Sequence, residues 1–286
     1  MDFPIEYLKG NEFPRLLREI PGPPKELNYR GKLPSPDMKL LAVVGSRHYT
    51  NYGKQVVDYL LSGLRGHNIG IVSGLALGID SLAHEAALLN DLYTLAIPGG
   101  GISDQVIYPA RHKPLARKIL EKGGGLLSEF APDFRATNWS FPQRNRLVCG
   151  ISHATLIIEA GEKSGTLITA KLTADYNREL LVVPGNIFSD NSKGVHQFMK
   201  LGATPITEPR DILNVLGLEV LSEAPRAKPA ALSTEESRIL QILTEPLTRD
   251  VLIRQLDLPV SAATVILMQM ELSGYIIEDN GVYRKS

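Results

Sequence analysis

Short apolar runs alternate with longer amphipathic stretches over most of the chain. The apolar runs, rich in valine, isoleucine and leucine, fall at residues 40–44, 69–73, 94–97, 126–128, 155–159 and 180–183. Stretches with helical periodicity lie between them at 53–65, 80–89, 114–122 and 166–176. Short, almost uniformly apolar runs are typical of strands that are buried on both faces of a parallel sheet. The alternation therefore predicts an α/β fold with a doubly wound, mostly parallel sheet, which binds ligands beyond the carboxyl ends of its strands.

The pattern changes at both ends of this region. Residues 1–37 are rich in proline, and we expect an arm with one short helical turn near Leu16 and Leu17, packed on the main domain of residues 38–217. Residues 218–231 have the composition of a linker. Residues 232–286 contain three helical patterns followed by a hairpin pattern, and this order predicts a small winged-helix domain.

Composition and charge exclude several classes of protein. The 31 basic and 31 acidic side chains give a formal net charge of zero, so nucleic-acid binding would require a local basic pocket. The single cysteine, Cys149, and six scattered histidines offer no spacing typical of a metal site. We expect no metal and no cofactor. The first residues lack the pattern of a signal peptide and no apolar stretch reaches about 20 residues, which favours a cytoplasmic protein without membrane contact.

Loops marked by glycine or hydroxyl residues follow four of the predicted strands, at 45–47, 73–80, 99–101 and 164–166. Glycine allows a backbone to approach an anion closely, and a helix amino terminus attracts negative charge. Each loop also has a simpler explanation: a tight turn, or in the second loop a helix capped by Asp80. None has the spacing of a dinucleotide-binding or P-loop motif.

The most informative cluster is Phe141-Pro142-Gln143-Arg144-Asn145-Arg146. Paired arginines bind phosphates and stack on bases, and aromatic rings such as Phe141 and the nearby Trp139 offer stacking surfaces. A solvated helix end with an apolar anchor remains the alternative. Because no catalytic triad, paired-carboxylate motif or metal set accompanies these loops, we predict binding of a phosphate backbone and no enzymatic activity.

The ordered motifs resemble those of the DNA-processing protein A family, also called DprA or Smf. The resemblance spans essentially the whole chain and rests on Phe13-Pro14-Arg15-Leu16-Leu17, Gly45-Ser46-Arg47, Ser73-Gly74 through Asp80, Pro98-Gly99-Gly100-Gly101, Tyr108-Pro109, Ser128-Glu129, Phe141 to Arg146, Glu159-Ala160, Ser164-Gly165-Thr166 and Val183-Pro184-Gly185.

This resemblance implies an extended Rossmann-like fold that forms a homodimer, binds single-stranded DNA and loads the RecA recombinase onto incoming DNA in natural transformation. It implies that Arg47 and the Arg144-Asn145-Arg146 run contact DNA. The family's usual lysine after Tyr-Pro is Ala110 here, so Arg111 is the expected substitute. A segment that usually contains Gly-Thr-Asn reads Gly194-Val195-His196.

The predicted DNA-binding residues are Gly45, Ser46, Arg47, Gly74, Gly99, Gly100, Gly101, Arg111, Phe141, Arg144, Asn145, Arg146, Ser164, Gly165 and Thr166. In the simplest arrangement Arg47 and Arg146 pair with successive phosphates, amides near Gly100 and Gly165 complete the cradle, and bases stack on Phe141.

Two alternatives remain. A nucleotide-processing enzyme of the phosphoribohydrolase ("lysine decarboxylase-like") type would require a glutamate where Thr169 stands. A winged-helix regulator with a ligand-sensing α/β domain would require a basic recognition helix, yet residues 261–273 contain no lysine or arginine. We expect the winged helix to contact protein or to be vestigial, and not to bind duplex DNA.

Overall fold

The computed structural model describes residues 3–162, 164–219, 233–279 and 281–285. The chain divides into two compact units, Met1–Val220 and Leu221–Ser286. Most of the predicted linker at 218–231 lies outside the described residues, although Leu218 packs against the core of the first unit.

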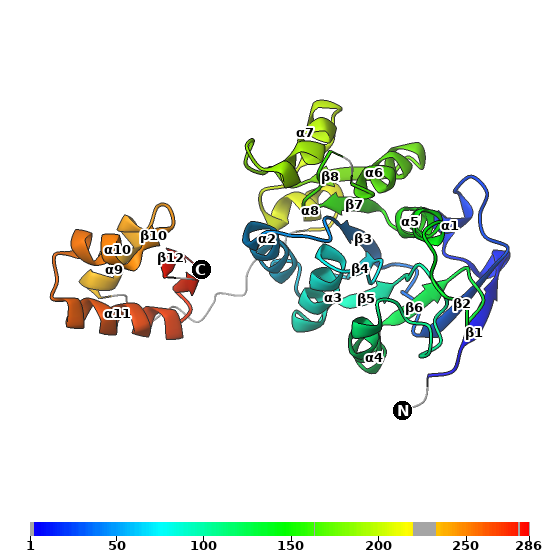
Figure 1. The fold of residues 1–286 in the computed structure, drawn as a ribbon, viewed down its shortest axis with the longest axis horizontal. Coiled ribbons are helices and arrows are strands. Elements are labelled where there is room, and N and C mark those ends of the chain that lie inside the picture. Colours follow the sequence, from blue (N-terminus) through cyan, green and yellow to red (C-terminus); the bar gives the residue numbers. More distant parts are fainter. Residues whose placement is uncertain (1–2, 163, 220–232, 280, 286) are drawn as a thin grey trace. The chain divides into compact units, whose positions relative to one another are not determined.

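A nine-stranded sheet organises the first unit, with the strand order β1-β2-β6-β5-β4-β3-β7-β8-β9 (Figure 1). Its strands are β1 Glu6–Lys9, β2 Glu26–Gly31, β3 Lys39–Val44, β4 Ile69–Ser73, β5 Tyr93–Ala96, β6 Gly125–Ser128, β7 Ala154–Ile157, β8 Glu179–Val182 and β9 Thr204–Pro205. Neighbours from β6 to β9 are parallel, whereas β2 is antiparallel to β6 and β1 to β2. The predicted mostly parallel α/β sheet is confirmed.

The chain order reverses between β3 and β7. From β3 the chain runs outward through β4, β5 and β6, then returns to the other side of β3 and continues through β7, β8 and β9. The crossover segments diverge at this switch point, and a crevice opens there beyond the carboxyl ends of the strands.

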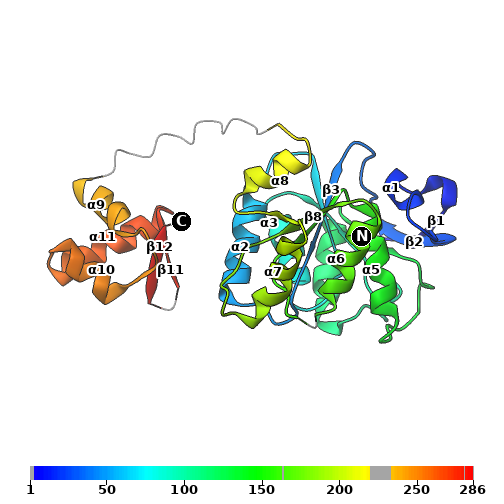
Figure 2. The same ribbon diagram turned by 90° about the horizontal axis from the view of Figure 1, so that it is seen from above.

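Alternation along β3 divides the apolar side chains between the two faces of the sheet. Leu41 and Val43 face one core and Leu40 and Val44 face the other. The first core is covered by α2 Asn51–Ser62, α3 Ile79–Leu89 and α8 Pro209–Val215; the second by α1 Arg15–Arg18, α5 Ser140–Ile151, α6 Thr166–Asp175 and α7 Lys193–Lys200 (Figure 2). The remaining helix, α4 Lys113–Glu121, packs Leu115 and Ile119 near β5 and β6. Short 3-10 helices occupy Gly10–Glu12, Ala110–His112 and Asp190–Ser192.

The proline-rich arm is more ordered than the sequence suggested. It contributes the helical turn that was predicted near Leu16, but also β1 and β2, which extend the sheet by antiparallel pairing. Only Leu8 of β1 and Leu27 and Arg30 of β2 are buried, and the other residues of the two strands are exposed or half-buried. The arm therefore shares the sheet of the first unit.

The second unit is a winged helix, as predicted. It contains α9 Thr234–Ile242, β10 Leu247–Thr248, α10 Arg249–Leu256, α11 Val260–Leu272, β11 Ile276–Asp279 and β12 Val282–Lys285. Ser233 begins α9 with a capping box, since its Oγ accepts from Glu236 N at 3.1 Å and the Glu236 carboxylate accepts from Ser233 N at 2.7 Å. Among the described residues no single helix is long and apolar enough to span a membrane; α10 and α11 meet that length and composition only as a pair bent by 114°.

Candidate functional site

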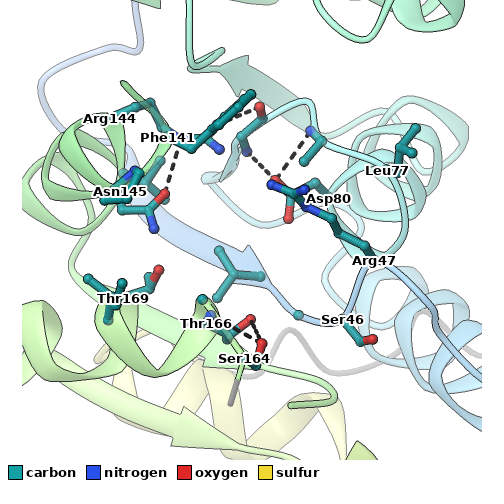
Figure 3. A pocket seen from close by; sticks show the side chains of 18 of the residues that line it. Ser46, Arg47, Leu77, Asp80, Phe141, Arg144, Asn145, Ser164, Thr166 and Thr169 are labelled. Carbon is teal, nitrogen blue, oxygen red and sulfur yellow. Dashed lines mark hydrogen bonds between the residues drawn. The ribbon is translucent and has the colours of Figure 1, made fainter. Parts of the chain in front are cut away.

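A pocket of about 670 Å³ lies at the switch point, beyond the carboxyl ends of β3, β4 and β7 (Figure 3). Most of the predicted binding residues line it: Gly45, Ser46, Arg47, Gly74, Phe141, Arg144, Asn145, Ser164, Gly165 and Thr166. The structure therefore brings together residues from loops that are up to about 120 positions apart in the chain.

A buried glutamate fixes the loop that follows β3. Ser46 N donates to the carbonyl oxygen of Glu159 at 2.8 Å. The Glu159 carboxylate accepts from Thr50 N at 2.9 Å and from Thr50 Oγ1 at 2.5 Å, while Thr50 Oγ1 caps α2 by accepting from Gly53 N. A side chain at Gly53 would lie 2.6 Å from the same carboxylate. These contacts hold the backbone of Arg47 in place and leave its side chain free to reach the pocket.

Arg47 is the exposed cation of the pocket. Within the described parts of the chain its guanidinium has no carboxylate partner and no hydrogen-bond partner. The guanidinium carbon lies 5.4 Å from the centroid of the Phe141 ring, within the range of a cation–π contact. The ring of Tyr108 lies 5.8 Å from that of Phe141 and is 56% exposed. Arg47, Phe141 and Tyr108 thus form a cluster in which the two rings are tilted by 49° to each other, and Tyr108 is its more accessible aromatic ring.

Arg144 has a different role, because it is buried and its Nη1 and Nε donors are already engaged, which leaves only Nη2 without a partner among the described residues. Its Nη1 donates to the carbonyl oxygen of Gly74 at 2.5 Å and to that of Ile97, and its Nε donates to the side chain of Asn145. A Cβ atom at Gly74 would overlap this guanidinium. Arg144 therefore ties the ends of β4 and β5 together beneath the pocket instead of offering a free charge to a ligand.

Asp80 lies beside Arg144 in the floor of the pocket. Its Oδ2 accepts from Gly74 N at 3.0 Å and from Ala76 N at 3.4 Å, so it stabilises the turn after β4. It does not cap α3, whose N-cap is Gly78. Burial raises the pKa of Asp80, while the positive charge of Arg144 and the backbone amides oppose this shift.

The amino terminus of α6 forms the opposite wall. Ser164 Oγ accepts from Thr166 N at 3.2 Å and donates to Thr166 Oγ1 at 2.9 Å. Gly165 has open space where a side chain would stand. The amides of Leu167 and Ile168 also donate within this turn, to the carbonyl oxygens of Ser164 and Gly165, so the helix dipole is what favours a bound anion here.

Sequence reasoning missed three pocket residues that complete the walls. Tyr108 belongs to a motif that was recognised, but its position beside Phe141 depends on the tertiary structure. Asn138 lies in a loop and Asn191 in the 3-10 helix Asp190–Ser192, and neither carries a sequence signal; Asn191 Nδ2 donates to the carbonyl oxygen of His48 at 2.8 Å and so holds the loop after β3.

The three glycines at 99–101 do not line the pocket. Side chains there would overlap the Phe141 ring at Gly99 and the carbonyl oxygens of Ala131 and Pro132 at Gly101. Gly101 N also donates to Phe134 O at 2.8 Å. The close approach that the glycine run predicted is therefore made by the chain's own segment 131–141 and not by a phosphate.

Arg146 and Arg111 also lie outside the pocket lining. Arg146 forms an ion pair with Glu129 and donates to the carbonyl oxygen of Gly22 in the arm at 2.7 Å. The predicted pairing of Arg47 and Arg146 with successive phosphates therefore lacks support, because Arg146 is occupied in holding the arm. Arg111 is exposed in the 3-10 helix before α4.

The described residues hold no group of three or more histidine, cysteine or acidic side chains that could bind a metal. Cys149 is buried, and burial raises the pKa of its thiol to about 11, so it is not a reactive nucleophile.

Comparisons with known proteins agree with this arrangement. Residues 5–217 match the family model for DNA recombination-mediator protein A, and residues 223–281 match that of the DprA winged helix domain. The chain is 36% identical to Protein Smf of Escherichia coli over 269 residues, which is 91% of this chain and 71% of the relative.

Two solved structures have similar folds. DNA processing protein A from Streptococcus pneumoniae matches with a TM-score of 0.68 and 34% identity, covering 74% of each chain. DNA processing protein A from Helicobacter pylori, described with a single-stranded DNA binding mode, matches with a TM-score of 0.66 and 30% identity, covering 75% of this chain and 96% of that one.

Proposed function

The chain belongs to the DNA recombination-mediator protein A family, and on this premise we propose that it binds single-stranded DNA in the pocket at the switch point. A phosphate lies between the Arg47 guanidinium and the amino terminus of α6. Unstacked bases contact the exposed face of Tyr108, which lies beside Phe141 in the cluster with Arg47.

The main support for this proposal is the Arg47 guanidinium, which is exposed and has no carboxylate partner among the described residues. Arg144 and Arg146, by contrast, are held by other groups of the protein. An unpaired arginine beside aromatic rings and a helix amino terminus suits a phosphate with an attached base.

Nucleotide hydrolysis receives no comparable support. Asp80 is the only carboxylic acid among the described residues that line the pocket, and its Oδ2 is committed to backbone amides. Thr169 occupies the place where the phosphoribohydrolase type would need a glutamate, and its side chain is buried.

The family assignment extends the proposal to partners. The chain delivers bound single strands to a RecA-type recombinase during recombination or transformation in the cytoplasm, and it acts as a homodimer. A filament-assembly assay on strands coated with single-strand-binding protein tests the first point, and sedimentation tests the second.

The test of the binding site is fluorescence anisotropy with a labelled, unstructured oligonucleotide across a salt series. Arg47→Ala should weaken binding and reduce the log–log salt slope by about 0.7, the value for one phosphate contact on a single strand. Arg65→Ala is the matched control, because Arg65 is also exposed but lies just before β4, at the opposite edge of the sheet, paired with Asp91 at 2.7 Å. Unchanged affinity and slope in Arg47→Ala, or equal losses in both variants, would remove Arg47 from the site.

A further inference from the structure

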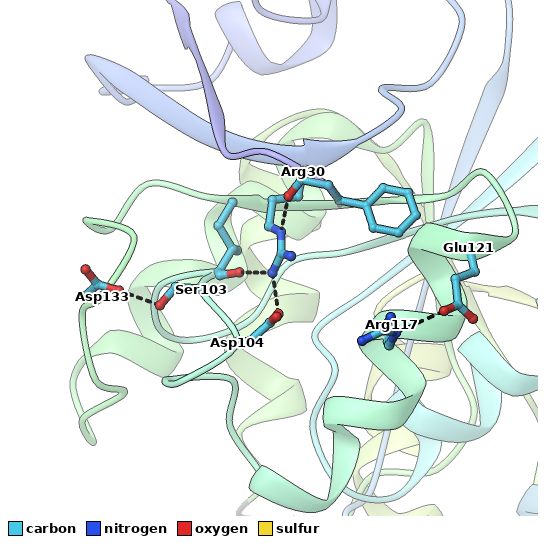
Figure 4. Close-up of polar contacts among 8 residues, drawn as sticks. Arg30, Ser103, Asp104, Arg117, Glu121 and Asp133 are labelled. Atoms are coloured by element: carbon cyan, nitrogen blue, oxygen red, sulfur yellow. Dashed lines mark hydrogen bonds and ion pairs between the residues drawn. The ribbon is translucent and has the colours of Figure 1, made fainter. Parts of the chain in front are cut away.

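A second cavity, of about 440 Å³, lies between α4 and the strands β2 and β6 (Figure 4). Its walls combine apolar side chains, among them Ile107, Leu120 and Leu126, with the charged side chains of Arg30, Asp104, Lys113 and Arg117. The residue after Ile107 is Tyr108, which lines the first pocket. Because consecutive Cα atoms are only about 3.8 Å apart, the two cavities are neighbours that share this segment as a wall.

A buried arginine reaches this cavity from β2. The side chain of Arg30 is 9% exposed. Its Nε donates to the carbonyl oxygen of Phe3 at 3.0 Å, and its Nη1 donates to the carbonyl oxygen of Ile102 at 3.0 Å and to Asp104 at 2.5 Å (Figure 4). Arg30 Nη2 has no hydrogen-bond partner within the part of the chain that the structure describes. The cavity therefore contains a rigidly held guanidinium with a spare pair of hydrogen-bond donors.

The helix beside the cavity is strongly basic, although the whole chain is neutral. Five exposed cations lie in residues 111–122, against the single acid Glu121: they are Arg111, Lys113, Arg117, Lys118 and Lys122. Lys113 and Arg117 lie one helical turn apart and line the cavity, whereas Lys118 and Lys122 do not. Two of the five cations therefore lie at the second cavity. Arg117 Nε also donates to the carboxylate of Glu121 at 3.0 Å on the exposed face of the helix, so a phosphate there would have to share Arg117 with Glu121 or displace it.

We propose that this cavity and the basic face of α4 form a second contact site for the same DNA strand. Nucleotides that leave the first pocket over Tyr108 place their phosphates against Lys113 and Arg117. One base enters the cavity, where Arg30 Nη2 donates to its edge. This inference rests on the proposed function, since it needs the strand to occupy the first pocket.

The test is a series of oligothymidylates from about 4 to about 16 nucleotides, the usual range of site sizes for single-strand binders. Affinity of the wild-type chain should rise when the oligonucleotide becomes long enough to reach α4. Lys113→Ala/Arg117→Ala should bind the shortest oligonucleotides like wild type but lose most of this gain, on the order of tenfold at low salt. Its salt slope with long oligonucleotides should fall by about 1.4, twice the value for one phosphate.

The control is Lys118→Ala/Lys122→Ala, which removes the same charge at the same spacing from α4 and its C-cap, outside the cavity lining. Equal losses of affinity in the two double variants, or a length dependence in Lys113→Ala/Arg117→Ala that matches wild type, would overturn this inference but would leave the proposed function intact. Absence of binding by wild type at every length, or short-oligonucleotide binding that does not depend on Arg47, would overturn the proposed function as well. Circular dichroism melting of both double variants should match wild type, because all four side chains are exposed.

Discussion

In the Arg144→Met variant the first unit should have a much lower free energy of unfolding, although we do not expect Arg144 to contact DNA directly. The guanidinium donates to the carbonyl oxygens of Gly74 and Ile97, and hydrogen bonds from a charged donor contribute about 1.5–3 kcal/mol each. Their loss leaves two buried carbonyls unpaired and removes the positive charge beside the buried Asp80. We expect the free energy of unfolding to fall by about 3–5 kcal/mol.

The assay is urea unfolding followed by the fluorescence of Trp139, the only tryptophan of the chain. Its ring lies 5.7 Å from those of Phe130 and Phe134, so its emission reports the first unit and not the winged helix. Arg47→Ala is the matched control, and its stability should change by less than about 0.5 kcal/mol because Arg47 is exposed.

A loss below about 1 kcal/mol in Arg144→Met would refute the structural role of Arg144. A folded Arg144→Met variant that lost about 0.7 of the salt slope for oligonucleotide binding would instead make Arg144 a phosphate ligand. In that case the hydrogen bonds to Gly74 and Ile97 would have to break when DNA binds.

Three further predictions follow from buried groups. Gly101→Ala should lower the free energy of unfolding by about 1–3 kcal/mol because its Cβ would overlap Pro132 O, whereas Gly165→Ala has open space and should cost less than about 1 kcal/mol; equal urea midpoints would contradict this. Burial lowers the pKa of His84 from 6.5 to about 3, so the unfolded chain takes up a proton that the folded chain excludes; stability should decline as the pH falls from 6.5 toward 3, and less steeply in His84→Gln. Cys149, whose thiol pKa burial raises to about 11, should react with a thiol reagent at pH 8 only after denaturation, and rapid labelling of the native protein would contradict its burial.

The central strands could be predicted from sequence because they are buried on both faces. β3, β4, β7 and β8 each start within about two residues of the predicted run, since parallel strands between two helical layers consist almost entirely of apolar residues. The edge strand β1 and its neighbour β2 were missed because their residues are mostly polar, and the prolines nearby favoured an irregular arm.

The site could be predicted only in part, because sequence identifies residue types but not which groups they satisfy. The motif containing Arg144 and Arg146 predicted two DNA-binding cations, but Arg144 lies in the floor of the pocket and Arg146 pairs with Glu129. The partners that decide this are the carbonyl oxygens of Gly74 and Ile97 and the arm residue Gly22, which no local pattern links to the motif. Arg47 was predicted correctly to lie in the pocket because it follows a central strand directly.

The number of free cations limits how tightly the first pocket alone can bind DNA. Among its described lining residues Arg47 is the one arginine or lysine not held by other protein groups, and one phosphate contact corresponds to a salt slope of only about 0.7. A helix amino terminus adds a partial charge of about half a unit. A strand held by these groups alone would dissociate readily at physiological salt. Tight binding therefore needs either further cations on the same chain, such as Lys113 and Arg117 at the second cavity, or a second copy of the chain on the same strand. A steep salt slope measured for a monomeric form would favour α4, and a slope that steepens only at concentrations where the chain dimerises would favour the second copy.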